Sequence, residues 1–129
     1  RDAQESRGLG DVYKRQDDSN SRTTIEMNDA SVRPAISGSV DNMEQYDVVL
    51  IGYPIWWGDA PRIINTFLES YDFSNKTIVP FCTSGGSAIG TSVSHLKSIT
   101  SNAQWYDGER FSSSTTHSDV DAWINRLNL

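Results

Sequence analysis

Residues 47–61, DVVLIGYPIWWGDAP, join a run of aliphatic residues to a loop that holds two adjacent tryptophans. The run at residues 47–52 is rich in β-branched side chains, which is typical of a strand buried on both faces of a parallel sheet. Neighbouring side chains of a strand point to opposite faces, so Trp56 and Trp57 fit a loop better than a continuing strand. A loop with this much apolar surface predicts that something covers it.

The segments downstream alternate between helical and extended patterns. Pro61 suits the first position of a helix, and apolar residues follow it at a spacing of three and four: Ile63, Ile64, Phe67, Leu68 and Tyr71. Residues 77–82 predict a second buried strand, in which Pro80 indicates a bulge or a nearby strand end. A third helix is expected at about residues 90–99.

The flanking segments complete the pattern. A short strand is expected at residues 103–105, continuing after Tyr-Asp-Gly into 109–111. A last helix is expected to start at Ser118, which with Asp121 resembles a capping box. Upstream, residues 22–28 predict a short helix and residues 39–46 a short helix or turn. This alternation predicts one α/β domain with a parallel sheet and helices on both faces.

Composition narrows the classes of partner. The chain has 129 residues, a formal net charge of −6 and no apolar run of about 18 residues, which argues against nucleic acid, an anionic membrane surface and a transmembrane helix. The single cysteine, Cys82, excludes an internal disulfide and fits a reducing, cytoplasmic setting. Neither Cys82 nor the two histidines has metal-ligand spacing.

Two loops follow the two predicted strands, YPIWWGDAP at residues 53–61 and CTSGGSAIG at residues 82–90. In open parallel sheets, ligands bind beyond the carboxyl ends of the strands. The first loop offers flat aromatic surface, and the second offers small residues with accessible backbone N–H groups. Together they suit a planar heteroaromatic ligand with polar edges.

These two loops also carry a family resemblance. Residues 46–90 resemble the flavodoxin family, most closely its bacterial branch with a Pro-Ile-Trp-Trp loop, and the resemblance extends over residues 17–129. It implies a three-layer, doubly wound sheet of order 2-1-3-4-5 and an FMN bound without a covalent link. The FMN-binding residues it implies are Pro54, Ile55, Trp56, Trp57, Thr83, Ser84, Gly85 and Gly86.

The N-terminal part departs from that family. Members begin with a strand, a phosphate-binding loop and a helix, which we do not find here, so we expect an incomplete domain that binds FMN weakly or not at all. DVYKRQ at residues 11–16 back-translates to DNA that resembles the end of a sequencing adapter. Residues 1–16 are therefore expected to be a non-native leader, or alternatively a disordered natural N-terminus.

Simpler interpretations of the same residues stay open. The two tryptophans could cap a core or a dimer seam. TSGGS lacks the spacing of a hydrolase nucleophile elbow, and Cys82 fits a buried apolar residue. Surface positions are expected for His95 and His117, and core positions for Trp105 and Trp123.

Three functions follow. The first is FMN-dependent electron transfer, as a carrier between redox proteins or as an NAD(P)H-linked oxidoreductase with a small-molecule acceptor; no side chain needs to act as acid, base or nucleophile. The others are an interaction module without flavin and a non-functional fragment. The oligomeric state is left open.

Overall fold

A parallel α/β sheet forms the centre of the molecule, as the sequence predicts. The computed structural model describes residues 20–100 and 102–129, so the predicted leader at residues 1–16 lies outside the described residues. Four strands form one sheet: β1 (Val48–Pro54), β2 (Thr77–Thr83), β3 (Gln104–Trp105) and β4 (Glu109–Phe111). Every pairing between them is parallel.

β2 is the central strand of the described sheet. It pairs with β1 along its whole length, from Val48 opposite Thr77 to Pro54 opposite Thr83. Its other edge pairs first with β3 and then with β4, and Pro80 lies in the gap between these two pairings. Gly108, with φ of 86°, passes Pro80 so closely that a Cβ there would lie 2.6 Å from the Pro80 carbonyl oxygen. The interruption that Pro80 indicates is therefore in the neighbouring segment, and β2 itself is regular.

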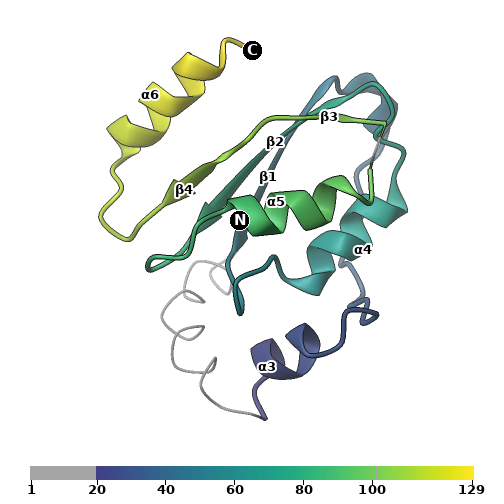
Figure 1. The fold of residues 1–129 in the computed structure, drawn as a ribbon. Coiled ribbons are helices and arrows are strands. Elements are labelled where there is room, and N and C mark those ends of the chain that lie inside the picture. The colour runs from purple at the N-terminus through teal and green to yellow at the C-terminus, as the bar shows by residue number, and fades with distance from the viewer. Residues whose placement is uncertain (1–19, 101) are drawn as a thin grey trace.

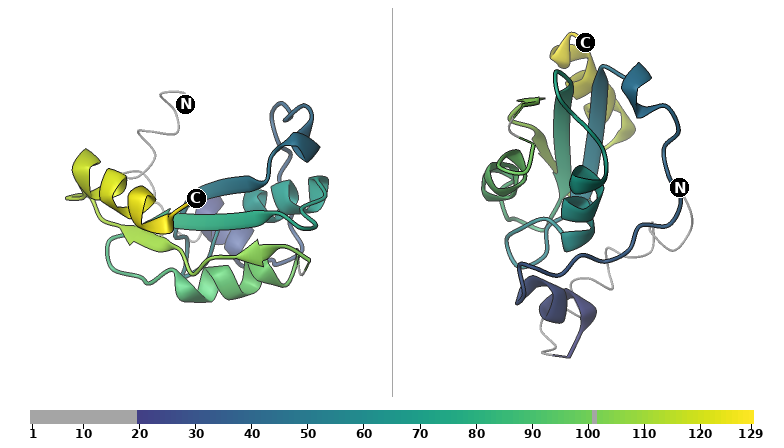
Figure 2. Two further views of the ribbon diagram at one scale, coloured as in Figure 1. Left: turned by 90° about the horizontal axis from the view of Figure 1, so that it is seen from above. Right: turned by 90° about the vertical axis from the view of Figure 1, so that its right-hand side faces the viewer.

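Helices lie on both faces of the sheet (Figures 1 and 2). The elements outside the sheet are α3 (Arg22–Met27), the 3₁₀ helix η1 (Met43–Gln45), α4 (Arg62–Ser70), α5 (Gly90–Lys97) and α6 (His117–Leu127). All five lie where the sequence places a helix or a helix-like turn. Pro61 precedes α4 as its N-cap, one position before the expected one, which is an ordinary difference at a helix end.

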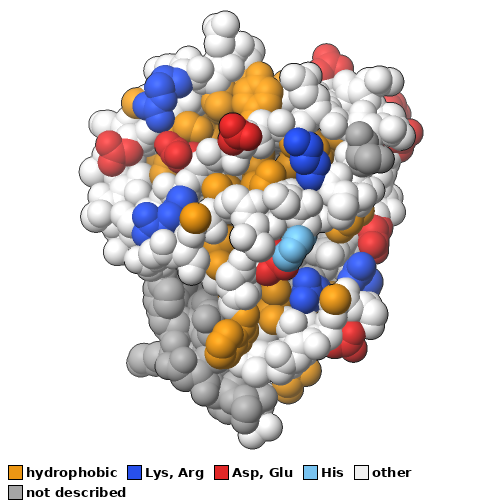
Figure 3. Space-filling model, viewed as in Figure 1, with side chains coloured by type: hydrophobic (Ala, Val, Ile, Leu, Met, Phe, Trp, Pro, Cys, Tyr) orange, Lys and Arg blue, Asp and Glu red, His pale blue; other side chains and the backbone are white. Residues whose placement is uncertain are grey.

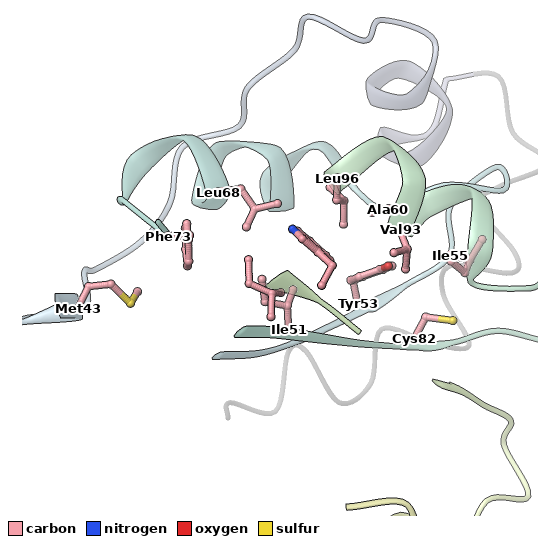
Figure 4. Packing of buried hydrophobic residues seen from close by; sticks show 12 residues of the cluster. Met43, Ile51, Tyr53, Ile55, Ala60, Leu68, Phe73, Cys82, Val93 and Leu96 are labelled. Atoms are coloured by element: carbon pink, nitrogen blue, oxygen red, sulfur yellow. The ribbon is translucent and has the colours of Figure 1, made fainter. Parts of the chain in front are cut away.

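The main core lies between the sheet and the pair α4 and α5 (Figure 4). It holds Ile51 and Tyr53 of β1, Leu68 of α4 and Leu96 of α5, each at most 6% exposed. On the opposite face, the Trp123 ring of α6 packs edge-on against rings of β2 and β4, with centroids 5.9 and 5.4 Å away. Trp105 and Trp123 are both buried, as predicted.

The prediction that both faces of β1 are buried is wrong. Leu50 is 43% exposed, whereas Ile51 beside it is 6% exposed. Successive residues face opposite sides of the sheet, and α4 and α5 cover only the side that holds Ile51. The one described helix on the other side, α6, contacts β2 and β4 through Trp123 and leaves Leu50 uncovered.

The predicted cap of the last helix is also wrong. Thr116 caps α6, and a capping box joins it to Asp119: the Asp119 amide donates to Thr116 Oγ1 at 3.2 Å, and the Thr116 amide donates to Asp119 Oδ2 at 2.9 Å. Ser118 lies inside the helix. Thr116/Asp119 and Ser118/Asp121 have the same spacing, so the local pattern alone does not separate them.

Candidate functional site

The two predicted loops meet at the carboxyl ends of β1 and β2. Pro54 and Thr83 are register partners at the ends of these strands, and the Ile55 amide donates to the Thr83 carbonyl at 3.1 Å. Adjacent parallel strands end at the same edge of the sheet, so the loops that follow them leave the sheet side by side. The structure thus places at one edge the predicted residues Pro54, Ile55, Trp56, Trp57, Thr83, Ser84, Gly85 and Gly86.

Residues 56–59, here named the tryptophan turn, form a tight hairpin. Trp56 and Asp59 exchange two backbone hydrogen bonds, of 2.8 and 3.0 Å. The two residues between them, Trp57 and Gly58, have φ values of 50° and 77°. Two successive positive φ values are typical of a type I′ turn, in which Asn or Gly is preferred. A bulky residue at such a φ is strained, and strain of this kind clusters at functional sites.

The two indoles diverge from this turn. Trp57 is 51% exposed, and its Nε1 donates to Thr24 Oγ1 at 3.2 Å. Trp56 is partly buried, and its Nε1 is shielded from solvent without an acceptor among the described residues. The turn therefore presents one flat aromatic surface outward and keeps an unpaired donor within.

α3 provides a third side of the site, which sequence reasoning missed. Ser21, Thr23 and Thr24 are polar but at most 8% exposed. Ser21 caps the helix, because its Oγ accepts from the Thr24 amide at 3.3 Å. The hydroxyl-rich run SNSRTT is the available signal, but nothing local in it indicates a contact with Trp57, which lies 33 positions after Thr24.

Residues 84–87, here named the glycine loop, are held at both ends. The Ser84 amide donates to the Phe111 carbonyl at 3.2 Å, and Ser84 Oγ donates to the Ser87 carbonyl at 2.6 Å. Between these anchors, Gly85 and Gly86 are exposed, and within the described residues their N–H groups have no acceptor. A Cβ at Gly86 would meet nothing within 4 Å, so open space lies beside it.

Asp59 ties the tryptophan turn to two helices. Its Oδ2 lies 2.6 Å from His95 Nδ1 of α5 and 3.8 Å from Arg62 Nη1 of α4. Its Oδ1 accepts from the Ala60 amide at 2.8 Å. His95 is a surface residue, as predicted, with 60% of its side chain exposed, and its contact with Asp59 joins residues 36 positions apart, which no local sequence pattern indicates.

Two ionisable side chains lie beneath the loops, and both are neutral near pH 7. Burial raises the pKa of the Cys82 thiol to about 11. Burial also raises the pKa of Tyr53 to about 12, against the opposing effect of its 2.9 Å hydrogen bond with Ser92 Oγ. Cys82 is fully buried, which confirms its prediction as a core residue and leaves no thiolate for nucleophilic chemistry.

Charge is mixed on the face that carries α4 and α5. Figure 3 shows acidic and basic side chains interspersed there, with apolar surface between them. None of the described helices is long and apolar enough to cross a membrane. The described residues also contain no group of three His, Cys, Asp or Glu side chains placed to hold a metal ion.

The geometry suits a planar ligand better than a reacting side chain. Trp57 supplies an exposed aromatic wall, and Gly85 and Gly86 supply two unpaired backbone donors on the adjacent loop. A flat heteroaromatic ring uses both, because its face stacks on an indole and its polar rim accepts hydrogen bonds.

Comparisons with known proteins agree with this description. A family model described as flavodoxin matches residues 11–127. A crystal structure of a candidate flavoprotein from Bacteroides uniformis is 41% identical, with a TM-score of 0.77, over 84% of this chain and 69% of that one. A candidate flavoprotein from Bacteroides eggerthii is 38% identical, with a TM-score of 0.75, over 98% of this chain and 90% of that one.

A flavoprotein from Lactobacillus acidophilus, crystallised in complex with FMN, is 25% identical with a TM-score of 0.60. That match covers 83% of this chain and 70% of the other. The comparison with curated proteins gave no match.

Proposed function

Because this chain belongs to the flavodoxin family, we propose that it binds FMN between the tryptophan turn and the glycine loop and serves in electron transfer. The observation that carries the proposal is that two features lie at the same edge of the sheet. One is the exposed indole of Trp57, and the other is the unpaired N–H groups of Gly85 and Gly86. The FMN complex of the Lactobacillus relative supports the choice of flavin.

The described residues fit the ring of the cofactor. Trp57 would cover one face of the ring, and Gly85 and Gly86 would donate to its polar rim. The open space beside Gly86 allows close approach of a ligand to the backbone. Pro54 and Ile55 end the strand beneath and fix where the tryptophan turn begins. Bound FMN supplies reversible uptake and release of electrons, and the protein supplies binding, orientation and electrostatics.

The two ionisable side chains beneath the loops are buried. Cys82 and Tyr53 stay protonated at neutral pH, so neither offers an ionised nucleophile to a bound flavin. The electron donor and acceptor are either redox proteins, as for a carrier, or NAD(P)H and a small molecule, as for an oxidoreductase. Rapid mixing of the flavin-loaded protein with NADPH separates these roles, because only direct hydride transfer bleaches the flavin absorbance without a partner protein.

The test of binding is a titration with FMN and, in parallel, with riboflavin, followed by flavin fluorescence. Both ligands carry the ring that Trp57, Gly85 and Gly86 would hold, and only FMN carries the phosphate. Saturable binding of either flavin supports the proposal. Equal affinity for the two means that the phosphate adds little to binding, whereas much tighter FMN binding shows that the chain holds the phosphate as well. Failure to bind either flavin contradicts the proposal and favours an interaction module.

A further inference from the structure

Arg110 of β4 donates two hydrogen bonds to Ser84, the first residue of the glycine loop. Its Nε donates to Ser84 Oγ at 2.8 Å, and its Nη2 donates to the Ser84 carbonyl at 3.0 Å. Two donors of one rigid guanidinium fix both the position and the orientation of the group they bind. Ser84 is 7% exposed and Arg110 is partly buried, so this contact is partly shielded from water.

The hydrogen bonds that begin at Arg110 continue to the other end of the glycine loop. Ser84 Oγ accepts from Arg110 and donates to the Ser87 carbonyl at 2.6 Å, which uses the donor and the acceptor capacity of one hydroxyl. These hydrogen bonds link Arg110 to Ser84 and Ser84 to Ser87, the residues on either side of the two glycines. Glycine has the largest backbone freedom of any residue type. Without such anchors, the N–H groups of Gly85 and Gly86 would therefore point in no fixed direction.

The charge of Arg110 is not neutralised by a nearby carboxylate in the part of the chain that the structure describes. The described ion pairs of the other arginines join Arg22 to Glu26, Arg33 to Glu69, Arg62 to Asp59 and Arg126 to Glu109. Arg110, which is partly buried, donates instead to the neutral oxygens of Ser84. A positive charge thus lies one residue from the unpaired N–H groups, where it strengthens their attraction for an electron-rich ligand edge.

From this geometry we infer that Arg110 is a positioning residue of the site. It holds the N–H groups of Gly85 and Gly86 in a preformed arrangement for the polar rim of a flavin, and its charge favours the reduced, more electron-rich form. The flavin part of this inference rests on the proposed function; the fixing of the loop does not. The expected consequences are tighter binding and a higher midpoint potential of the bound flavin than an unanchored loop would give.

The test compares Arg110→Gln and Arg110→Lys with the wild-type protein. Arg126→Gln is the matched control, because Arg126 contacts the same strand through Glu109 at 3.4 Å without touching the glycine loop. Three quantities are measured: the FMN dissociation constant, the midpoint potential of bound FMN, and the heteronuclear NOE of the Gly85 and Gly86 amides in the flavin-free protein. Thermal unfolding identifies any variant that fails to fold, and Ser84→Ala then provides an independent cut of the same chain of bonds.

Arg110→Gln is expected to weaken FMN binding about tenfold, to lower the potential and to reduce both NOE values. Arg110→Lys keeps the charge but loses the pair of hydrogen bonds to Ser84. It should therefore reduce the NOE values and the affinity while the potential stays near that of the wild type. A merely structural arginine would move the unfolding temperature and leave the potential unchanged. Wild-type affinity, potential and NOE values in Arg110→Gln would overturn the inference.

Failure of the proposed function gives a different result. If the wild-type protein binds no flavin, the ligand part of the inference fails with the proposed function. The NOE comparison then still decides whether Arg110 fixes the loop: reduced values in Arg110→Gln support it, and unchanged values overturn it.

Discussion

His95 and Asp59 lie 2.6 Å apart, Nδ1 to Oδ2, and join α5 to the tryptophan turn. The residues are 36 positions apart in the sequence, so the contact exists only in the folded chain. Asp59 ends the turn that carries the exposed Trp57, and its other oxygen accepts from Ala60. The pair therefore limits how far the indole wall can move relative to α5.

His95→Gln is expected to loosen the tryptophan turn with little effect on overall stability. The His95 side chain is 60% exposed, so the loss in the free energy of unfolding should stay below about 1 kcal/mol. The FMN dissociation constant should rise about threefold, because the contact between His95 and Asp59 then no longer holds the tryptophan turn in place. His117→Gln is the control, since His117 pairs with Asp121 at 3.2 Å within α6, away from the turn. Equal effects of the two substitutions would contradict this role for His95.

Trp57→Gly tests whether Trp57, despite its strained backbone, serves FMN binding and not the stability of the fold. Glycine adopts the φ of 50° found at Trp57 at no steric cost, which offsets the lost hydrogen bond to Thr24. The free energy of unfolding in urea should therefore change by less than about 1 kcal/mol. FMN affinity should fall about tenfold or more, because the aromatic wall is gone. A variant that keeps wild-type affinity would show that the ring does not stack on Trp57.

Gly52→Ala is expected to destabilise the fold. Gly52 faces Phe81 across the β1–β2 pair, and a Cβ at position 52 would lie 2.3 Å from two atoms of the Phe81 ring. Relief requires the ring to move away from its contacts with Phe111 and Trp123, so a loss of about 1–3 kcal/mol should appear in urea unfolding. Gly86→Ala, which meets no atom within 4 Å, is the control and should unfold like the wild type. A Gly52→Ala protein of wild-type stability would refute the clash.

Stability should decline in alkaline solution because two buried acids resist ionisation. Folding raises the pKa of Cys82 from 9.0 to about 11 and that of Tyr53 from 10.0 to about 12. The unfolded chain releases these protons first, so the contribution of both groups is complete below about pH 9 and is lost as the pH rises through their folded values. Urea midpoints at pH 8, 9.5 and 11 measure the decline. Cys82→Ala should flatten its first part; an unchanged slope would argue against a buried thiol.

Thr116→Ala tests which residue caps α6. Removal of the Thr116 hydroxyl should cost about 1 kcal/mol in the free energy of unfolding, because the Asp119 amide loses its acceptor. The Thr116 backbone and side chain lower the pKa of Asp119, so the chemical shift titration of that carboxyl gives a second readout and should move upward in the variant. Ser118→Ala is the control and should be close to neutral. The opposite ranking would restore the cap predicted from Ser118 and Asp121.

The origin of the missed contacts is the same in each case. Arg110 reaches Ser84 over 26 positions, and Trp57 reaches Thr24 over 33. No local period or turn pattern connects such residues, because their distance is set by how strands and helices stack. The prediction for the cap of α6 is wrong for a different, local reason, because Thr116/Asp119 and Ser118/Asp121 have the same spacing. Thr115 and Ser112 form a turn, with a 3.1 Å backbone hydrogen bond, that brings the chain into the helix at Thr116.

The sequence by itself determined the elements and the edge of the sheet where they bring ligand-binding loops together. Aliphatic runs, helical spacing and the two loop compositions are local properties, and parallel strands necessarily end at a common edge. Only the tertiary structure decided which faces are covered and which side chains brace the site. Leu50 and Ile51 share one strand pattern, but burial depends on which helix lies above each of them. Likewise, Arg110 and His95 acquire their roles from contacts that form when β4 and α5 pack beside the loops.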